Sequence, residues 1–338
     1  MKKHFFDLPD NRSAYLYQLR LEDGFGADIT DFGGCLVSLF VPDRHGNLTD
    51  VVLGWKNPEK YITNPAYLGA LVGRIPNRIS NGRFELDGKI YQMVLNDRRA
   101  STLHGGFSYA HRLWQLERHT ATELELSLTS PDGDAGFPGT VQIKVLYKLH
   151  TDHTLEFSFE VRSDKTTVAD LTNHAYFNLD GDASGPCDEH TLQLKSDYVT
   201  EVNQLLQPTG KSLDVTGTFF DVRQKKKFKD IFAAIPNGFD HNFILGNKNN
   251  TPHDAAVIAE GGSSGIRLTM HTDRPGVQIY MGGASGEGKN GTYVPCGGFC
   301  LETQNWPDAV NHPDFPSVRL EPGEKLHGRT LYNFSIAD

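Results

Sequence analysis

An acidic residue within a strand-like run is the first feature of this sequence that predicts chemistry. Glu302 stands between Leu301 and Thr303, where the pattern of neighbours indicates a buried strand. Because burying a carboxylate without a partner is costly, Glu302 must find a partner or have a raised pKa. A pKa raised towards neutrality suits a general base. The run around Glu302 is therefore a candidate active-site segment.

Polar and ionisable residues interrupt apolar strand patterns in four larger islands and two smaller ones. The islands include histidine, arginine, aspartate, glutamine and glutamate side chains, with aromatic residues beside them. Planar amides and carboxylates pair with hydroxyl groups, and aromatic rings lie against the C–H face of a sugar. This composition predicts a sugar pocket. The larger islands are 73–79, 103–106, 172–179 and 299–308, and the smaller ones are 239–243 and 275–280.

Each of these residues also has a structural interpretation when it is taken alone. A single histidine such as His174 is commonly a hydrogen-bonded structural residue. An arginine such as Arg78 is commonly an ion-pair partner, and the Gly-Gly that follows His104 is commonly a turn. Only the islands taken together point to a function.

The islands resemble the motifs of the aldose 1-epimerases, which are also called galactose mutarotases. They appear in the order of that family from position 73 to position 308, so the resemblance covers nearly the whole chain. One departure is Ile75-Pro76 in the first motif. Pro76 fixes φ and removes a backbone donor, but it leaves the following Asn-Arg pair in place. The matching segments are Gly-Arg-x-x-Asn-Arg-Ile (73–79), Leu-His-Gly-Gly (103–106), Thr-Asn-His-x-Tyr-Phe-Asn-Leu (172–179), Phe-Asp-His-Asn (239–242), Pro-Gly-Val-Gln (275–278) and Leu-Glu-Thr-Gln-Asn-Trp-Pro-Asp (301–308).

The resemblance implies an enzyme that interconverts the α and β anomers of a free aldohexose, such as galactose or glucose, without a cofactor. It implies that Glu302 takes the proton from the anomeric hydroxyl and that His174 protonates the ring oxygen. It also implies a group of binding residues that hold the other hydroxyls and the ring oxygen. These are Asn77, Arg78, His104, Asp240 and Gln278.

Three other functions stay open from the sequence. A sugar-binding or regulatory protein on the same fold is expected to have lost the equivalent of Glu302 or His174, and both are present. A metal-dependent sugar isomerase or lyase needs ligand spacing, but the 14 histidines form no H-x-H or H-E-x-x-H cluster, so no metal site is expected. A sugar-phosphate epimerase needs a basic cluster, for which the islands offer only Arg74 and Arg78.

Period-two alternation along most of the chain indicates the strands that would carry these residues. Apolar residues occupy alternate positions of 141–149 and 155–161 on either side of a polar break, as in an antiparallel hairpin. The segment 84–91 places Asp87-Gly88 where a two-residue turn requires positive φ. No stretch of helical period is longer than about ten residues.

These patterns predict an all-β protein. We expect residues 1–338 to form one domain, a large antiparallel β-sandwich with little helix, in which the site occupies a groove. The resemblance implies the same galactose mutarotase-like sandwich. The segments near 181–189 and 246–254 are rich in Gly, Asp, Asn and Pro, and we expect them to be surface loops because strands resume after each.

The net charge and the distribution of apolar residues limit the kinds of partner that the protein can bind. Thirty-three Lys and Arg against 42 Asp and Glu give a formal charge of −9, which argues against nucleic acid. The basic run from Arg223 to Lys229 is interpreted as an exposed loop. The sequence shows neither a secretory signal nor a run of about 18 apolar residues, so we expect a cytoplasmic protein that binds a small sugar and no membrane. The four cysteines are expected to be reduced and buried.

Overall fold

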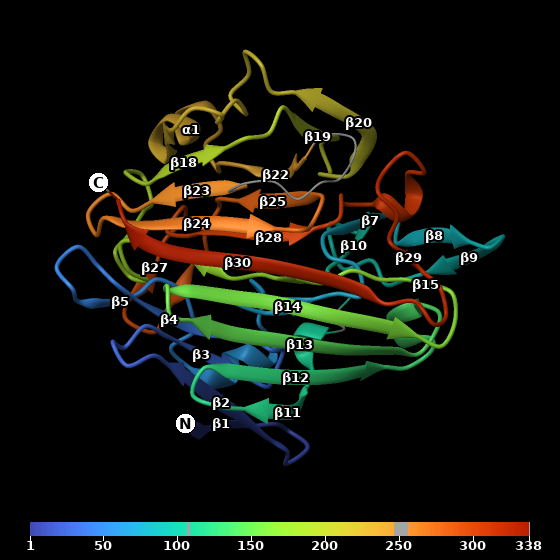
Figure 1. Cartoon of the computed structure of the whole chain (residues 1–338). Helices are drawn as coiled ribbons and strands as arrows, with labels where there is room; N and C mark the ends of the chain where they lie inside the picture. Colours follow the sequence, from blue (N-terminus) through green and yellow to red (C-terminus); the bar gives the residue numbers. More distant parts are fainter. Residues whose placement is uncertain (107–108, 247–255, 338) are drawn as a thin grey trace.

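The computed structural model describes residues 1–106, 109–246 and 256–337 (Figure 1). Its large sheets are antiparallel, and the described residues include one α-helix, α1 (Phe228–Ala234), so the prediction of an all-β fold with little helix is confirmed. Short 3₁₀ turns are η1 (Pro58–Ile62), η2 (Tyr109–His111), η3 (Asp134–Gly136) and η4 (Ala309–Asn311).

A nine-stranded sheet runs across the middle of the molecule in Figure 1. The predicted hairpin forms its centre, where Val145 pairs with Phe159 and Tyr147 with Phe157. Alternate side chains of this hairpin are buried, as period two requires. In spatial order the strands are β11 (Gln115–His119), β12 (Glu123–Ser130), β13 (Val141–His150), β14 (Thr154–Ser163), β30 (Leu326–Ile336), β24 (Ile266–Thr272), β23 (Val257–Glu260), β18 (Thr191–Leu194) and β21 (Lys226–Lys227).

A six-stranded sheet packs against it. Tyr332 in β30 donates a hydrogen bond from its hydroxyl to the carbonyl oxygen of Leu301 at 3.3 Å, and the hydroxyls of Thr303 and Thr330 lie 2.6 Å apart. The hydrophobic core fills the space between these faces. In spatial order the strands of the second sheet are β17 (Tyr176–Phe177), β28 (Phe299–Gln304), β25 (Gly276–Tyr280), β22 (Asp240–Ile244), β19 (Tyr198–Val202) and β20 (Pro208–Asp214).

Smaller sheets complete the described part of the chain. A five-stranded sheet near the N-terminus contains β1 (Lys2–Asp7), β2 (Ser13–Arg20), β3 (Gly26–Thr30), β4 (Leu36–Pro42) and β5 (Leu48–Asp50). Two-stranded ladders pair β6 (Leu71–Val72) with β16 (Thr172–Asn173), β7 (Arg78–Ser80) with β10 (Ser101–Leu103), β8 (Arg83–Leu86) with β9 (Lys89–Gln92), β15 (Thr167–Val168) with β29 (Arg319–Leu320), and β26 (Gly286–Glu287) with β27 (Thr292–Tyr293).

The turn predicted at Asp87-Gly88 joins β8 to β9. Both residues have positive φ, 52° at Asp87 and 76° at Gly88, as the mirror-image hairpin turn requires. The segment 181–189 contains turns and no regular strand, as predicted, whereas the expected loop at 246–254 lies largely outside the described residues.

Two expectations from the sequence are wrong. The basic run at 223–229 is a loop only at 223–225, because the rest forms β21 and the start of α1, which buries Phe228 and Ile231. Three of its lysines are also paired: Lys225 donates to Glu260, and Glu189 accepts from both Lys227 and Lys229. Cys296 is partly exposed, unlike the buried Cys35, Cys187 and Cys300, although all four cysteines are free thiols.

Among residues 1–106, 109–246 and 256–337, no helix has the length and apolar character needed to span a bilayer.

Candidate active site

The six-stranded sheet presents polar side chains on the face that is turned away from the core. Gln278 pairs directly with Glu302 on one side and with Asn242 on the other, so these three side chains share a face. Their neighbours Val277 and Leu301 point the opposite way, into the core. The alternation of the strands thus separates a site face from a folding face.

One short ladder outside the large sheets brings the first two motifs together. In the β7–β10 pair Leu103 lies opposite Arg78, and the amide of His104 donates to the carbonyl oxygen of Asn77 at 2.9 Å. Gly105 follows at φ +69°, and a Cβ there would lie 2.1 Å from the backbone oxygen of Gly73. Only glycine allows this close approach, which explains the first glycine of the Leu-His-Gly-Gly motif.

His174 lies between β16 and β17, in a connection that is fixed by backbone hydrogen bonds. Its amide donates to the carbonyl oxygen of Ala70 at 2.8 Å, and its carbonyl oxygen accepts from the amide of Gly69 at 3.0 Å. The ring of Tyr176 stacks on the imidazole with centroids 5.1 Å apart. These contacts hold the imidazole against β28.

The structure brings the two predicted catalytic residues together. Nε2 of His174 lies 3.7 Å from Oε1 of Glu302, and both side chains are almost fully buried. His104 completes a buried group, because one nitrogen or oxygen atom from each of these three side chains lies within 4.8 Å of the other two. Oε2 of Glu302 and Oε1 of Gln278 are buried without a hydrogen-bond partner. Such acceptors are costly unless a ligand or water satisfies them.

Each imidazole has a hydrogen-bond partner at its Nδ1. The backbone amide of Asn77 donates to Nδ1 of His104 at 3.2 Å, so the neutral ring carries its proton on Nε2. Nδ1 of His174 has the thiol of Cys300 at 3.5 Å. A histidine that ligates a metal through Nε2 normally donates from Nδ1, which the amide of Asn77 opposes. The group formed by His104, His174 and Glu302 therefore suits hydrogen bonding to a ligand better than metal coordination.

Arg78 and Asp240 lie at the edge of this group. Gln278 donates from Nε2 to Oδ1 of Asp240 at 2.7 Å, while Nη1 of Arg78 lies 3.9 Å from Oδ2 of the same carboxylate. Arg78 donates from Nε to Oδ2 of Asp97 at 2.7 Å. All seven predicted site residues are thus linked, directly or through one another, around Glu302.

Several contacting side chains were not predicted. Tyr67 has its ring 4.7 Å from that of His104, and Asp97 and Cys300 contact Arg78 and His174 respectively. Cys300 is two positions before Glu302, so strand parity could have placed it on the same face. No sequence pattern marks Tyr67 or Asp97.

Burial determines the protonation of the central pair. Desolvation raises the pKa of Glu302 well above its usual range, the charge of Asp240 raises it further, and the guanidinium of Arg78 opposes both. Desolvation also lowers the pKa of His174 to about 4. The pKa of His104 is lowered well below its usual value by burial and then by His174 and Arg78. Burial therefore favours the neutral forms of Glu302, His174 and His104.

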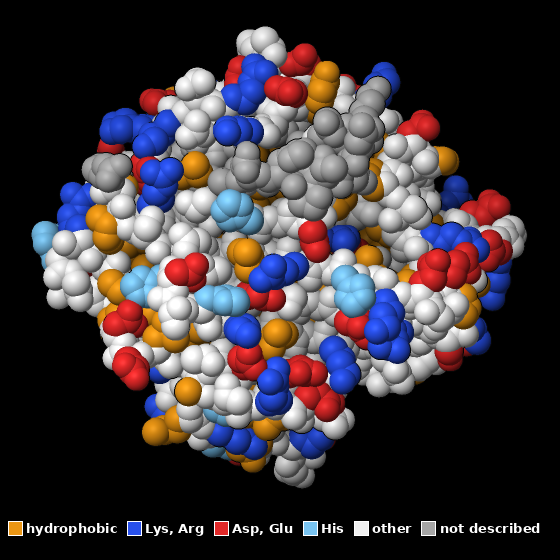
Figure 2. Space-filling view, viewed as in Figure 1, with side chains coloured by type: hydrophobic (Ala, Val, Ile, Leu, Met, Phe, Trp, Pro, Cys, Tyr) orange, Lys and Arg blue, Asp and Glu red, His pale blue; other side chains and the backbone are white. Residues whose placement is uncertain are grey.

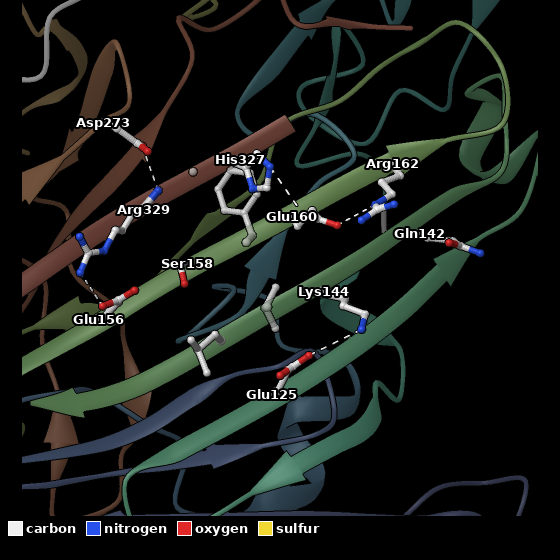
Figure 3. A pocket seen from close by; sticks show the side chains of 14 residues that line it. Glu125, Gln142, Lys144, Glu156, Ser158, Glu160, Arg162, Asp273, His327 and Arg329 are labelled. Atoms are coloured by element: carbon white, nitrogen blue, oxygen red, sulfur yellow. Dashed lines mark hydrogen bonds and ion pairs between the residues drawn. The ribbon is translucent and has the colours of Figure 1, made fainter. Parts of the chain in front are cut away.

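A groove elsewhere on the molecule lies across β12, β13, β14 and β30 (Figure 3). Its charged side chains pair with one another, as Glu156 does with Arg329 at 2.8 Å and Glu160 with Arg162 at 2.7 Å. Figure 2 shows acidic and basic side chains intermixed over this face of the molecule. Because these groups already have partners, the groove is a weaker candidate than the group around Glu302.

Comparison with known proteins identifies the family of the chain. The sequence model of the family described as Aldose 1-epimerase matches residues 15–333. The chain belongs to the aldose 1-epimerase family. Relatives of this epimerase-family chain include galactose mutarotase from Rattus norvegicus, 39% identical over 339 residues that cover 98% of each chain. Aldose 1-epimerase from Escherichia coli K12 is 33% identical over 337 residues, which cover 96% of each chain.

Solved structures of aldose epimerases share the fold. An aldose epimerase homologue from C. elegans superposes with a TM-score of 0.89 at 29% identity, covering 96% of this chain and 100% of that one. Galactose 1-epimerase from Lactobacillus acidophilus NCFM gives a TM-score of 0.84 at 27% identity, covering 100% of this chain and 99% of the other. The family resemblance and the fold predicted from the sequence are confirmed.

Proposed function

We propose that the chain interconverts the α and β anomers of free aldohexoses, with galactose and glucose as substrates, by opening and closing the pyranose ring. The observation that carries this proposal is the buried pair of Glu302 and His174, with 3.7 Å between a carboxylate oxygen and an imidazole nitrogen. The names of the relatives support the same activity, since they are galactose mutarotases and aldose 1-epimerases.

Ring opening needs one proton to leave a sugar oxygen and another to arrive. The hydroxyl on C1 is too weak an acid to ionise near pH 7, and the ring oxygen leaves poorly unless it is protonated. Glu302 accepts the proton from the C1 hydroxyl while His174 gives one to the ring oxygen, so the C1–O5 bond breaks and a free aldehyde forms. Rotation about C1–C2 presents the other face of the carbonyl group. The reverse proton transfers then close the ring as the other anomer.

The two halves of the reaction need the same number of protons on the catalytic pair. Opening starts with the proton on His174, and closing starts with it on Glu302. The raised pKa of Glu302 and the lowered pKa of His174 favour the second arrangement. The positive charge of Arg78 lowers the pKa of Glu302 and so favours the ionised carboxylate that opening requires.

The binding residues hold the part of the sugar that does not rotate. Asp240 has a carboxylate oxygen, Oδ2, that Gln278 does not occupy, and it suits a sugar hydroxyl as an acceptor. His104 offers its Nε2 proton as a donor, and Arg78 offers the outer edge of its guanidinium. We assign Asn77 to orienting His104 through its backbone amide as well as to the binding group.

Polarimetry tests the proposed function directly. Freshly dissolved α-galactose and α-glucose should reach anomeric equilibrium faster with the protein than in buffer alone, in proportion to protein concentration. Calorimetric binding of galactose without faster exchange would instead indicate a non-catalytic sugar-binding protein. Inhibition by glucose 6-phosphate at lower concentration than by glucose would point to a phosphorylated substrate.

The pH dependence of kcat/KM is expected to be bell-shaped, because the reaction requires one proton on the catalytic pair. Below about pH 4, the pKa of His174, the pair gains a second proton and Glu302 cannot accept another. Above the raised pKa of Glu302 the pair loses its last proton and has none to donate. Polarimetric rates corrected for the buffer reaction at each pH measure this curve. An acid limb at the ordinary imidazole pKa of about 6.5 would contradict the assignment.

Substitutions in the binding group are expected to act on KM. Asp240→Asn removes the charge that strengthens a hydrogen bond to a sugar hydroxyl, so the KM for galactose should rise by about 10-fold or more. His104→Gln should raise KM less, because it loses a neutral hydrogen bond. Initial rates over a range of galactose concentrations separate KM from kcat. A fall in kcat with no change in KM for Asp240→Asn would show that Asp240 does not act through binding.

A further inference from the structure

Arg78 is shared unequally between two carboxylates. It donates from Nε to Oδ2 of Asp97 at 2.7 Å, but its Nη1 lies 3.9 Å from Oδ2 of Asp240, which is too long for a hydrogen bond. The side chain of Arg78 is 8% exposed and that of Asp97 14%, so water screens this pair weakly. The guanidinium is therefore hydrogen-bonded to Asp97, whereas Asp240 lies near it without a hydrogen bond.

Oδ2 of Asp240 has no hydrogen bond to the guanidinium of Arg78 and can accept one from a ligand. Its Oδ1 accepts from Gln278 at 2.7 Å, and its side chain is 27% exposed, so it remains accessible. An arginine released from its anchor would find Asp240 as the nearest carboxylate and could form a close, two-point ion pair with it. Such a pair would occupy the oxygen that a sugar hydroxyl needs.

Asp97 is itself held in a closed backbone turn. Its amide donates to the carbonyl oxygen of Ser101 at 3.1 Å, and its carbonyl oxygen accepts from Ala100 at 2.9 Å. Ser101 begins β10, which pairs with β7 so that Leu103 lies opposite Arg78. The anchor and the arginine are thus connected through one short ladder, which fixes their relative position.

We propose that Asp97 is a positioning residue that holds Arg78 away from Asp240 and so keeps Asp240 open to a sugar hydroxyl. This inference rests on the proposed function, because it concerns binding of the same sugar. Under this proposal the turn before β10 affects substrate affinity through Arg78, and Asp97 itself does not bind the sugar.

The test compares Asp97→Ala and Asp97→Asn with the unaltered protein. Asp97→Ala removes the anchor, and the KM for galactose should rise by about 10-fold while kcat changes by less than about 3-fold. Asp97→Asn keeps the shape and an acceptor oxygen, so its KM should lie between the two. Asp87→Asn is the matched control, because Asp87 pairs with Arg319 in the exposed turn between β8 and β9 and its change should leave both constants unaltered.

A double substitution shows whether Asp97 acts through the Arg78–Asp240 contact. In Asp240→Asn the attraction for Arg78 is already weakened, so adding Asp97→Ala should raise KM no further. A crystal structure of Asp97→Ala should show Nη1 of Arg78 within about 3.2 Å of Oδ2 of Asp240. Independent, multiplicative effects on KM, or an unmoved Arg78, would overturn the inference.

The outcomes separate this inference from the proposed function. Unaltered KM in Asp97→Ala, with normal exchange by the unaltered protein, would overturn the role of Asp97 alone. If the unaltered protein exchanges no anomers, the proposed function fails, and calorimetric titration with galactose then measures the effect of Asp97 on affinity directly. An unchanged dissociation constant in that titration would overturn the inference as well.

Discussion

Glu302→Gln is expected to slow anomer exchange by at least about 10²-fold, the low end for a positioned general base. The amide keeps the shape of the carboxyl group and can still accept a hydrogen bond, but it cannot take the proton from the C1 hydroxyl. The loss should appear in kcat, with KM changed little, because the geometry around Gln278 is retained. Polarimetry with the buffer rate subtracted measures it.

The same substitution should not weaken the fold. Burial raises the pKa of Glu302, so the ionised carboxylate opposes folding at pH values above its ordinary pKa. A neutral amide removes that cost, and the melting temperature of Glu302→Gln should equal or exceed that of the unaltered protein at pH 8. Glu85→Gln, on an exposed position of β8, is the control for both measurements. An unchanged rate in Glu302→Gln would remove this residue from the mechanism.

His174→Asn is expected to cause the second large loss, also at least about 10²-fold in kcat. Asparagine is polar and near in size, but it has no proton to give to the ring oxygen at any working pH. The acid limb of the pH profile, which follows the pKa of His174 near 4, should move or disappear in this variant. The substitution His45→Asn in an exposed loop should change neither the rate nor the profile.

A binding measurement on His174→Asn shows whether the variant has lost only its proton donor or also the structure of the site. Calorimetry should show that His174→Asn still binds galactose, because Asp240, Gln278 and His104 are untouched. A variant that loses binding and rate together would indicate that His174 supports the site through its contacts with Tyr176 and Cys300 rather than through proton transfer.

Strand alternation made much of the fold predictable. The β13–β14 hairpin and the turn at Asp87-Gly88 follow from local pattern, because alternate burial and positive φ each leave a direct trace in the residue types. The helix α1 is not predictable from the basic run, because only Phe228 and Ile231, two buried apolar residues three apart, mark its core-facing side. Here a short helix depends on tertiary packing more than on its own composition.

The sequence predicts which residues belong to the candidate active site, but it does not predict how they lie relative to one another. A carboxylate in an apolar strand marked Glu302 on physical grounds, whereas the part of His174 came from the family resemblance. Their separation of 3.7 Å depends on the pairing of β28 with β17 and on the connection after β16, neither of which is local. Asp97 left no signal, because only the β7–β10 ladder brings it to Arg78.

In β22, β25 and β28, side chains point alternately to the candidate site and to the core. This alternation offers a practical route to changing which sugar the protein accepts. Positions on the candidate-site face alternate with interior positions, so a library of variants can alter the chemistry of one surface while the hydrophobic packing behind it is left intact. Sites for such diversification are Asp240, Asn242 and Gln278, and the positions to preserve are Phe243, Val277 and Leu301. Insertion or deletion of a single residue within these strands would exchange the two sets and lose both.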